Sequence, residues 1–170
     1  MSDEVEIGRG KRGRRAYTLD DIALVPSRRT RDPEDVNVGW QIDAYHVDTP
    51  LMAAPMDSVM SPETAIAFGR LGGIGVLDLD GLWTRYEDPT PILDRIAHLG
   101  EEESIATLQR VYSEPIKPSL ITARLKQLRE AGVVVAGKLS PQRVQKHWRA
   151  VVDAGVDLLI IRGSTVSAEH

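Results

Sequence analysis

The sequence contains no cysteine, so it can form neither disulfide bonds nor cysteine-ligated metal sites, and this absence fits a reducing compartment. No hydrophobic run reaches about 18 residues, the length of a membrane-spanning helix. The first residues lack the apolar stretch of a secretion signal. The net charge of −4 gives no support for general nucleic-acid binding. We therefore expect a cytoplasmic protein that binds neither membranes nor nucleic acid.

Positive charges are concentrated near the start of the chain. The first cluster consists of Lys11, Arg12, Arg14 and Arg15. Such a cluster can contact phosphate groups or nucleic acid, but no aromatic side chains alternate with it to stack on bases. We interpret residues 1–16 as a flexible basic leader and residues 17–170 as the folded domain.

Beyond residue 50 the sequence alternates between apolar strand patterns and amphipathic helix patterns. Four apolar segments are predicted as buried strands: residues 51–54, 74–79, 133–136 and 156–161. The first intervening helix has clear limits, since Ser61 can cap it, Pro62 suits its first turn and Gly72 can end it. Repeated strand–helix–strand units build parallel sheets and barrels.

Four strands with helices between them make either a small open sheet or half of an eight-stranded barrel. A complete barrel typically needs about 250 residues, which is more than the 170 present. An open sheet needs edge strands with one polar face, whereas the four predicted strands are apolar throughout. We therefore predict an α/β fold that corresponds to the first half, about four βα units, of a (β/α)8 TIM barrel.

Pro55, Met56 and Asp57 directly follow the first predicted strand, where α/β proteins usually bind ligands. Met56 offers an apolar surface to a ring, and Asp57 can accept hydrogen bonds from a ligand. A structural role fits equally well, in which Met56 fills a gap and Asp57 braces a turn. The spacing favours neither alternative.

Polar residues also follow the second and third predicted strands. Asp78 and Asp80 alternate and so share a side, which suits a metal or an acid–base pair, but the absence of a nearby third ligand favours a polar rim. Lys138 can attract a phosphate or carboxylate group, although a lone lysine is more often solvated. The glycines of residues 72–75 precede a strand, whereas a phosphate-binding loop follows one, so we interpret them as the strand entry.

These segments together resemble the IMP dehydrogenase/GMP reductase family, and most closely its short actinobacterial branch without CBS domains. The matching segments are residues 17–22, 50–59, 72–77 and 154–161. The resemblance covers nearly the whole chain, which corresponds to the N-terminal half of the family's barrel. It implies a (β/α)8 fold, usually tetrameric, that binds a purine nucleotide and exchanges a hydride with NAD or NADP at C2 of the base.

The resemblance also implies site residues. Met56 resembles the methionine that packs on the purine nucleotide, Asp57 resembles its neighbour, and Ala54 stands where dehydrogenases commonly have a serine that touches the nucleotide. The implied substrate set for an IMP- or GMP-like ligand is therefore Ala54, Met56 and Asp57. The implied cofactor set after the fourth strand is Arg162, Gly163, Ser164 and Thr165. Dehydrogenases carry an aspartate and serines there, and an arginine instead favours an anionic group.

Family members use a cysteine thiolate that adds to the purine ring, because thiolates are strong nucleophiles near neutral pH. This chain has no cysteine, so we assign no catalytic residue and no metal ligand and expect the 170-residue chain alone to be inactive. One hypothesis is an N-terminal fragment of an IMP-dehydrogenase-related oxidoreductase. The alternative is a non-enzymatic half-barrel or pseudoenzyme that self-associates or binds a partner.

Overall fold

A computed structural model describes residues 4–25 and 32–163 of the chain, which divides into two compact units, residues 1–37 and 38–170. The first unit contains an antiparallel hairpin of β1 (Glu4–Gly8) and β2 (Lys11–Arg14), followed by the 3-10 turns η1 (Leu19–Asp21) and η2 (Pro33–Asp35). An ion pair of 3.4 Å joins Arg12 to Glu4 across the hairpin. The basic segment near the start of the chain is thus arranged as a hairpin, and its flexibility stays a prediction.

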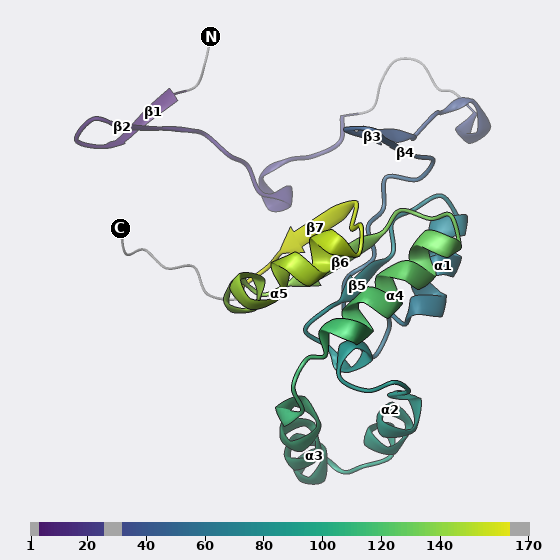
Figure 1. Cartoon of the computed structure of the whole chain (residues 1–170). Coiled ribbons are helices and arrows are strands. Elements are labelled where there is room, and N and C mark those ends of the chain that lie inside the picture. The colour runs from purple at the N-terminus through teal and green to yellow at the C-terminus, as the bar shows by residue number, and fades with distance from the viewer. Residues whose placement is uncertain (1–3, 26–31, 164–170) are drawn as a thin grey trace. The chain divides into compact units, whose positions relative to one another are not determined.

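The second unit contains the βα repeats (Figure 1). Its elements, in chain order, are β3 (Trp40–Ile42), β4 (Tyr45–Val47), α1 (Pro62–Arg70), β5 (Val76–Asp78), η3 (Leu82–Thr84), α2 (Thr90–Ala97), α3 (Glu101–Ser113), α4 (Pro118–Glu130), β6 (Ala136–Leu139), α5 (Pro141–Asp153) and β7 (Leu158–Ile161). No helix in the described ranges is long and apolar enough to cross a membrane.

A parallel sheet with strand order β5–β6–β7 forms the centre of this unit. Residues 51–54 join it beside β5, since Met52 pairs with Ile74 and Ala53 N donates to the Ile74 carbonyl at 2.9 Å. Segment 51–54, β5, β6 and β7 therefore lie next to one another in the same order as in the sequence. Segment 51–54 pairs through a single bridge, and β6 begins at Ala136, three residues later than its start was predicted.

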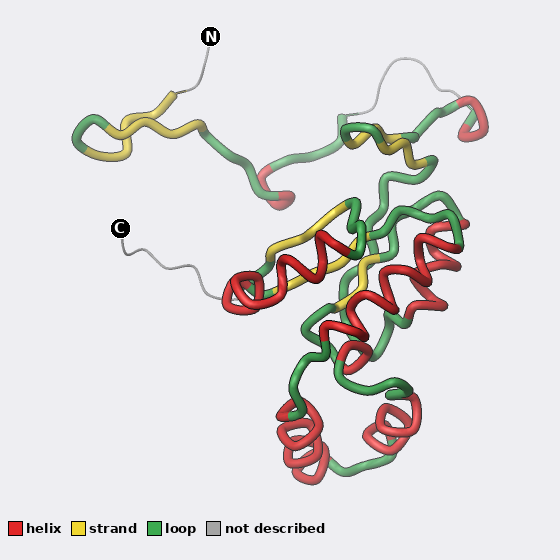
Figure 2. Tube along the Cα trace, in the orientation of Figure 1, coloured by secondary structure: helices red, strands yellow, loops and turns green. Residues whose placement is uncertain are grey.

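Helices α1, α4 and α5 cover this sheet, and Figure 2 shows α4 and α5 beside its strands. Helix α4 buries Ile121, Leu125 and Leu128 completely, because their spacing places them on one helical face. They pack in one cluster with Leu77 and Leu139 from the sheet. The predicted helix signals are confirmed: the Ser61 hydroxyl caps α1 at 3.1 Å from Thr64 N, and the turn after α1 has Gly72 at φ +88°.

Asp157 ties the β3–β4 hairpin to the amino end of the sheet. Its carboxylate accepts hydrogen bonds from Tyr45 Oη at 2.7 Å, Arg129 Nη2 at 2.6 Å and Val135 N at 2.8 Å. Burial raises the pKa of Asp157, but these three donors outweigh it and hold the pKa below its ordinary value. The carboxylate is therefore ionised and bonded at neutral pH.

Close packing of α1 on the start of β5 depends on a glycine. A Cβ atom at Gly75 would lie 2.5 Å from Ala65 Cα and 2.6 Å from Ala65 O, so even one methyl group does not fit. We expect Gly75→Ala to lower the free energy of unfolding by about 1–3 kcal/mol, as overpacking of a core typically does.

Urea denaturation of Gly75→Ala and of the control Gly100→Ala measures this effect. Nothing lies within 4 Å of a Cβ at Gly100, and its φ of −68° suits alanine. Equal stability of the two variants would contradict the close approach at Gly75.

Candidate functional site

Charged side chains meet where the parallel strands end. Asp78 ends β5, Asp80 follows two residues later, and Lys138 lies opposite Asp78 in β6. Lys138 Nζ is 3.2 Å from Asp78 Oδ1 and 3.2 Å from Asp80 Oδ2, and all three side chains are only 15–17% exposed. The expectation that Lys138 is a lone, solvated lysine is therefore wrong, because the sheet register places it between two carboxylates.

Burial and the neighbouring charges alter the pKa values of Lys138 and Asp78. Burial lowers the pKa of Lys138, but Asp78 and Asp80 outweigh it and raise that pKa above its ordinary value. Burial raises the pKa of Asp78 despite the nearby lysine. Lys138 thus stays charged at neutral pH and pairs with both carboxylates, which offsets one of their two negative charges.

Asp80 extends the cluster to the loop that follows β6. Its Oδ2 accepts a hydrogen bond from Ser140 N at 2.6 Å, whereas its Oδ1 is buried without a partner in the described structure. Within residues 4–25 and 32–163, no group of three or more acidic or histidine side chains could hold a metal ion. The pair Asp78 and Asp80 therefore joins strand ends through Lys138 and Ser140.

Asp57 is turned toward the loop that follows β5. Its Oδ2 accepts hydrogen bonds from Leu82 N at 2.8 Å and from the Tyr112 hydroxyl of α3. Its Oδ1 is buried without a described partner, and a Cβ at Gly81 would lie 2.1 Å from that atom. Burial raises the pKa of Asp57, and the two hydrogen bonds partly oppose the rise. Of the two alternatives for Asp57, this structure supports bracing, and a contact with substrate stays a prediction.

Met56 and Ala54 lie on the surface of the same loop. Met56 is 48% exposed, and its carbonyl accepts hydrogen bonds from Val59 N at 3.0 Å and Met60 N at 2.8 Å. Ala54 is also exposed. The loop therefore has a defined backbone turn and an exposed thioether next to the half-buried Asp57 anchor.

The predicted cofactor residues follow β7. Arg162 and Gly163 are exposed, and Arg162 N donates to the Leu139 carbonyl at 3.1 Å, which continues the pairing of β7 with β6. Ser164 and Thr165 lie outside the described residues. The structure thus places Ala54, Met56 and Asp57 at the end of the segment beside β5, and Arg162 and Gly163 after β7.

The sequence analysis did not identify Arg85 and Tyr112 as part of this region. Arg85 is 5% exposed, and its guanidinium donates to the carbonyls of Asp80, Tyr112 and Glu114. These bonds join the end of β5 to the end of α3. The only signal in the sequence was an arginine among apolar residues just after a strand, and nothing there links position 57 to position 112.

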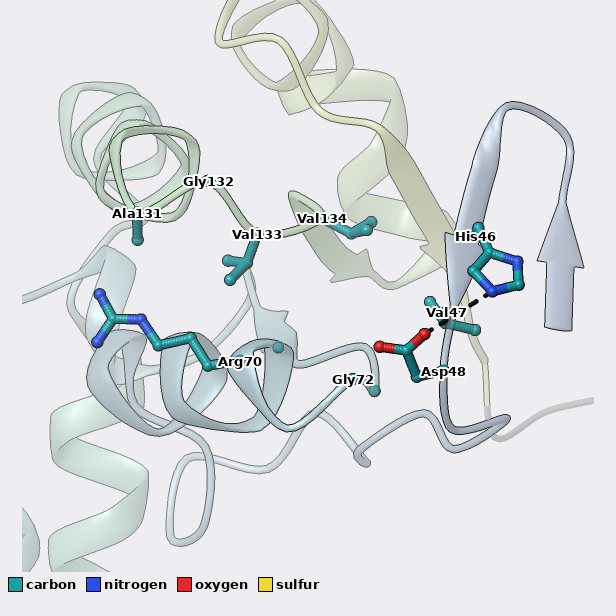
Figure 3. A pocket seen from close by; sticks show the side chains of 11 residues that line it. His46, Val47, Asp48, Arg70, Gly72, Ala131, Gly132, Val133 and Val134 are labelled. Atoms are coloured by element: carbon teal, nitrogen blue, oxygen red, sulfur yellow. Dashed lines mark ion pairs between the residues drawn. The ribbon is translucent and has the colours of Figure 1, made fainter. Parts of the chain in front are cut away.

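A cavity of about 240 Å³ lies at the opposite, amino end of the strands. Figure 3 shows the His46–Asp48 pair, 3.8 Å apart, at one end of this cavity and Arg70 at the other. A neighbouring cavity of about 230 Å³ contains Tyr45, Arg129 and Asp157, which already bond to one another. In parallel barrels the amino end serves stability and the carboxyl end carries chemistry. We therefore place the candidate site at the carboxyl end.

Comparison with known proteins gives a consistent result. The family model "IMP dehydrogenase / GMP reductase domain" matches residues 16–169. An uncharacterised oxidoreductase of Mycolicibacterium smegmatis is 44% identical over 98% of the chain and 46% of its own length. The inosine-5′-monophosphate dehydrogenase of Methanocaldococcus jannaschii is 41% identical over 38% of the chain and 13% of its own length.

A solved structure resembles the chain over almost its full length. The crystal structure of an IMP dehydrogenase/GMP reductase-like protein from Corynebacterium glutamicum matches with a TM-score of 0.81 and 43% sequence identity. The match covers 99% of this chain and 46% of that protein. The chain thus spans somewhat less than half the length of the Mycolicibacterium smegmatis oxidoreductase and of this structural relative.

The charge cluster at the strand ends makes the stability depend on Lys138. Lys138→Met leaves two partly buried carboxylates uncompensated, so we expect a loss of about 1–3 kcal/mol at neutral pH, between the values for exposed and buried ion pairs. The pKa of Asp78 is already raised and rises further without the lysine. The native state of the variant then takes up a proton as the pH falls toward about 4, and the loss shrinks.

Urea denaturation at several pH values tests this dependence. The control is Lys126→Met, which removes an exposed ion pair with Glu130, 3.6 Å apart, and should change stability little. A Lys138→Met loss that is as small as the control's, or that does not change with pH, would contradict the coupling of Lys138 to Asp78.

Proposed function

Because the chain belongs to the IMP dehydrogenase/GMP reductase family, we propose that it supplies one wall of a purine-nucleotide site in an oxidoreductase that transfers a hydride between NAD or NADP and C2 of the base. The observation that carries the proposal is the loop of residues 54–57 at the carboxyl end of the sheet. Asp57 anchors this loop by hydrogen bonds to Leu82 N and to the Tyr112 hydroxyl, and Met56 is left exposed beside the anchor. A flat base can pack on such a thioether.

We further propose that the chain forms the first four βα units of a (β/α)8 barrel. The parallel strands in chain order and the coverage of about half of the relatives' length support this proposal. In the described residues β7 pairs only with β6, and its residues Leu158, Leu159 and Ile160 are half-buried. Such a strand has room for a further pairing partner.

Two residues of the proposed cofactor set, Arg162 and Gly163, lie in the described part of the chain, so their surroundings can be compared with what a cofactor needs. The exposed Arg162 guanidinium has no hydrogen-bond partner in the described structure and lies just past a strand end, which fits an anionic group such as a phosphate. Bound NAD or NADP would supply or accept the hydride. In this proposal Arg162 holds an anion, Met56 contacts the base, and Asp57 fixes the loop that carries Met56.

A second candidate function is that of a non-enzymatic half-barrel that associates with itself or a partner. The observation that favours it is Ile161, which is 58% exposed at the end of the edge strand β7.

The homo-oligomer and the cytoplasmic location also remain proposals. Family membership supports them. The predicted start of the folded domain at residue 17 is likewise a proposal: the family match begins at residue 16, whereas the two compact units divide after residue 37.

Nucleotide binding tests the proposed site directly. Calorimetric titration of the chain with IMP and with GMP should detect binding of one of them, and Met56→Ala should weaken that binding about tenfold because an apolar contact with the base is lost. The control Leu71→Ala also removes an exposed apolar side chain, 78% exposed, but at the end of α1 next to Gly72. Equal affinities of the two variants would contradict the role of Met56.

Catalysis by this chain alone gives a separate test. The sequence has no thiol that could add to the purine ring. We therefore expect no NADH when the chain is incubated with IMP and NAD, as followed by absorbance. Measurable turnover would show that the proposed need for a thiolate is wrong.

A further inference from the structure

We propose that Tyr112 is a positioning residue: through its hydroxyl, the inserted α2–α3 segment holds Asp57 and so sets the conformation of the loop that presents Met56 to the nucleotide. The identity of the ligand in this inference rests on the proposed function. The link from Tyr112 to Asp57 rests on geometry alone.

The α2–α3 segment is inserted between η3 and α4 and adds little to the core. In its two helices only Val111 is buried, while Ile105 and Leu108 are exposed. Helices α2 and α3 pack on each other. The segment therefore needs a specific attachment to take up a defined position.

The attachment lies at the carboxyl end of α3. Arg85 donates to the carbonyls of Tyr112, at 3.0 Å, and Glu114, and its guanidinium lies 5.5 Å from the centre of the Tyr112 ring. The Tyr86 hydroxyl donates to the Val111 carbonyl at 3.1 Å. These contacts fix the backbone and the ring of Tyr112 in the position from which its hydroxyl donates to Asp57.

The Tyr112 hydroxyl is one of two described donors to the Asp57 carboxylate, and the other is Leu82 N. Asp57 is 55 residues away in sequence and directly follows Met56. Because the Met56 carbonyl is itself bonded within the turn, a displacement of Asp57 is passed to Met56. Tyr112 thus acts on the exposed side chain through the anchor.

The surrounding charges make the link depend on pH. Asp57 is faced by Tyr112 from α3, Arg85 from the loop after β5, Lys138 from β6 and Asp78 from β5. Burial raises the pKa of Asp57, and the Tyr112 hydrogen bond lowers it. Burial also raises the pKa of Tyr112, so its hydroxyl keeps its proton at neutral pH. Loss of the hydroxyl should therefore raise the pKa of Asp57 further.

A matched pair of variants tests the link. Tyr112→Phe and Tyr86→Phe each remove one hydroxyl from the attachment of α3, but only Tyr112 touches Asp57. Two measurements are made on the full chain: the NMR titration of the Asp57 carboxyl carbon without ligand, and the affinity for IMP between about pH 5 and pH 8.

For Tyr112→Phe we expect a raised Asp57 pKa and IMP binding about tenfold weaker, the effect of one charge-assisted hydrogen bond. As the pH is lowered, the IMP affinity of this variant should begin to fall at a higher pH than the affinity of the unmodified chain, because its Asp57 takes up a proton at a higher pH. Tyr86→Phe should leave both measurements nearly unchanged. In an Asp57→Asn background, Tyr112→Phe should no longer shift the pH dependence, because the titrating group is gone.

An unchanged Asp57 titration in Tyr112→Phe overturns the link, and a shifted titration with unchanged IMP affinity overturns the positioning role. Equal effects of the two tyrosine variants overturn it as well, because they indicate a general loosening of α3. Absence of both IMP and GMP binding by the unmodified chain overturns the proposed function and the nucleotide part of the inference. The ligand-free titration still decides the Tyr112–Asp57 contact.

Discussion

One lysine, placed between two carboxylates, holds the carboxyl ends of β5 and β6 together. Lys138 neutralises one of the charges of Asp78 and Asp80, and Asp80 also accepts the backbone amide of Ser140. Because these groups are largely withdrawn from water, their ion pairs and hydrogen bonds offset part of the cost of burying charge. The strand ends are thereby kept in register, and the loops that would contact a ligand start from fixed positions.

The same region depends on the space beside Asp57. Gly81 has no side chain, so the Asp57 carboxylate can approach the loop after β5 and reach Leu82 and Tyr112. Arg85 joins this loop to the end of α3. Hydrogen bonds from the Arg85 and Tyr112 side chains thus connect the inserted helices to the loop after β5 and to Asp57. An oxidoreductase of this family would gain a nucleotide-facing loop whose geometry is controlled from outside the sheet.

The helices were predictable because their signals are local. Ser61 and Pro62 begin α1, and the spacing of Ile121, Leu125 and Leu128 defines the buried face of α4. The start of β6 was less predictable, since the valines before Ala136 are hydrophobic like strand residues. The amide of Val135 bonds to the Asp157 carboxylate instead of a neighbouring strand. Hydrophobicity reports burial, whereas a strand is defined by its pairing partner.

The sequence by itself determined the order of strands and helices beyond residue 50, the family, and the loop of residues 54–57 as the candidate site. All of these depend on residues close together in the chain. Only the tertiary structure decided that Lys138 is paired, that Asp57 is a half-buried anchor, and that its partner Tyr112 is 55 residues away in sequence. The physical reason is that the partner of a buried charge is set by sheet register and helix packing. Neither sheet register nor helix packing can be predicted from the local pattern of residues.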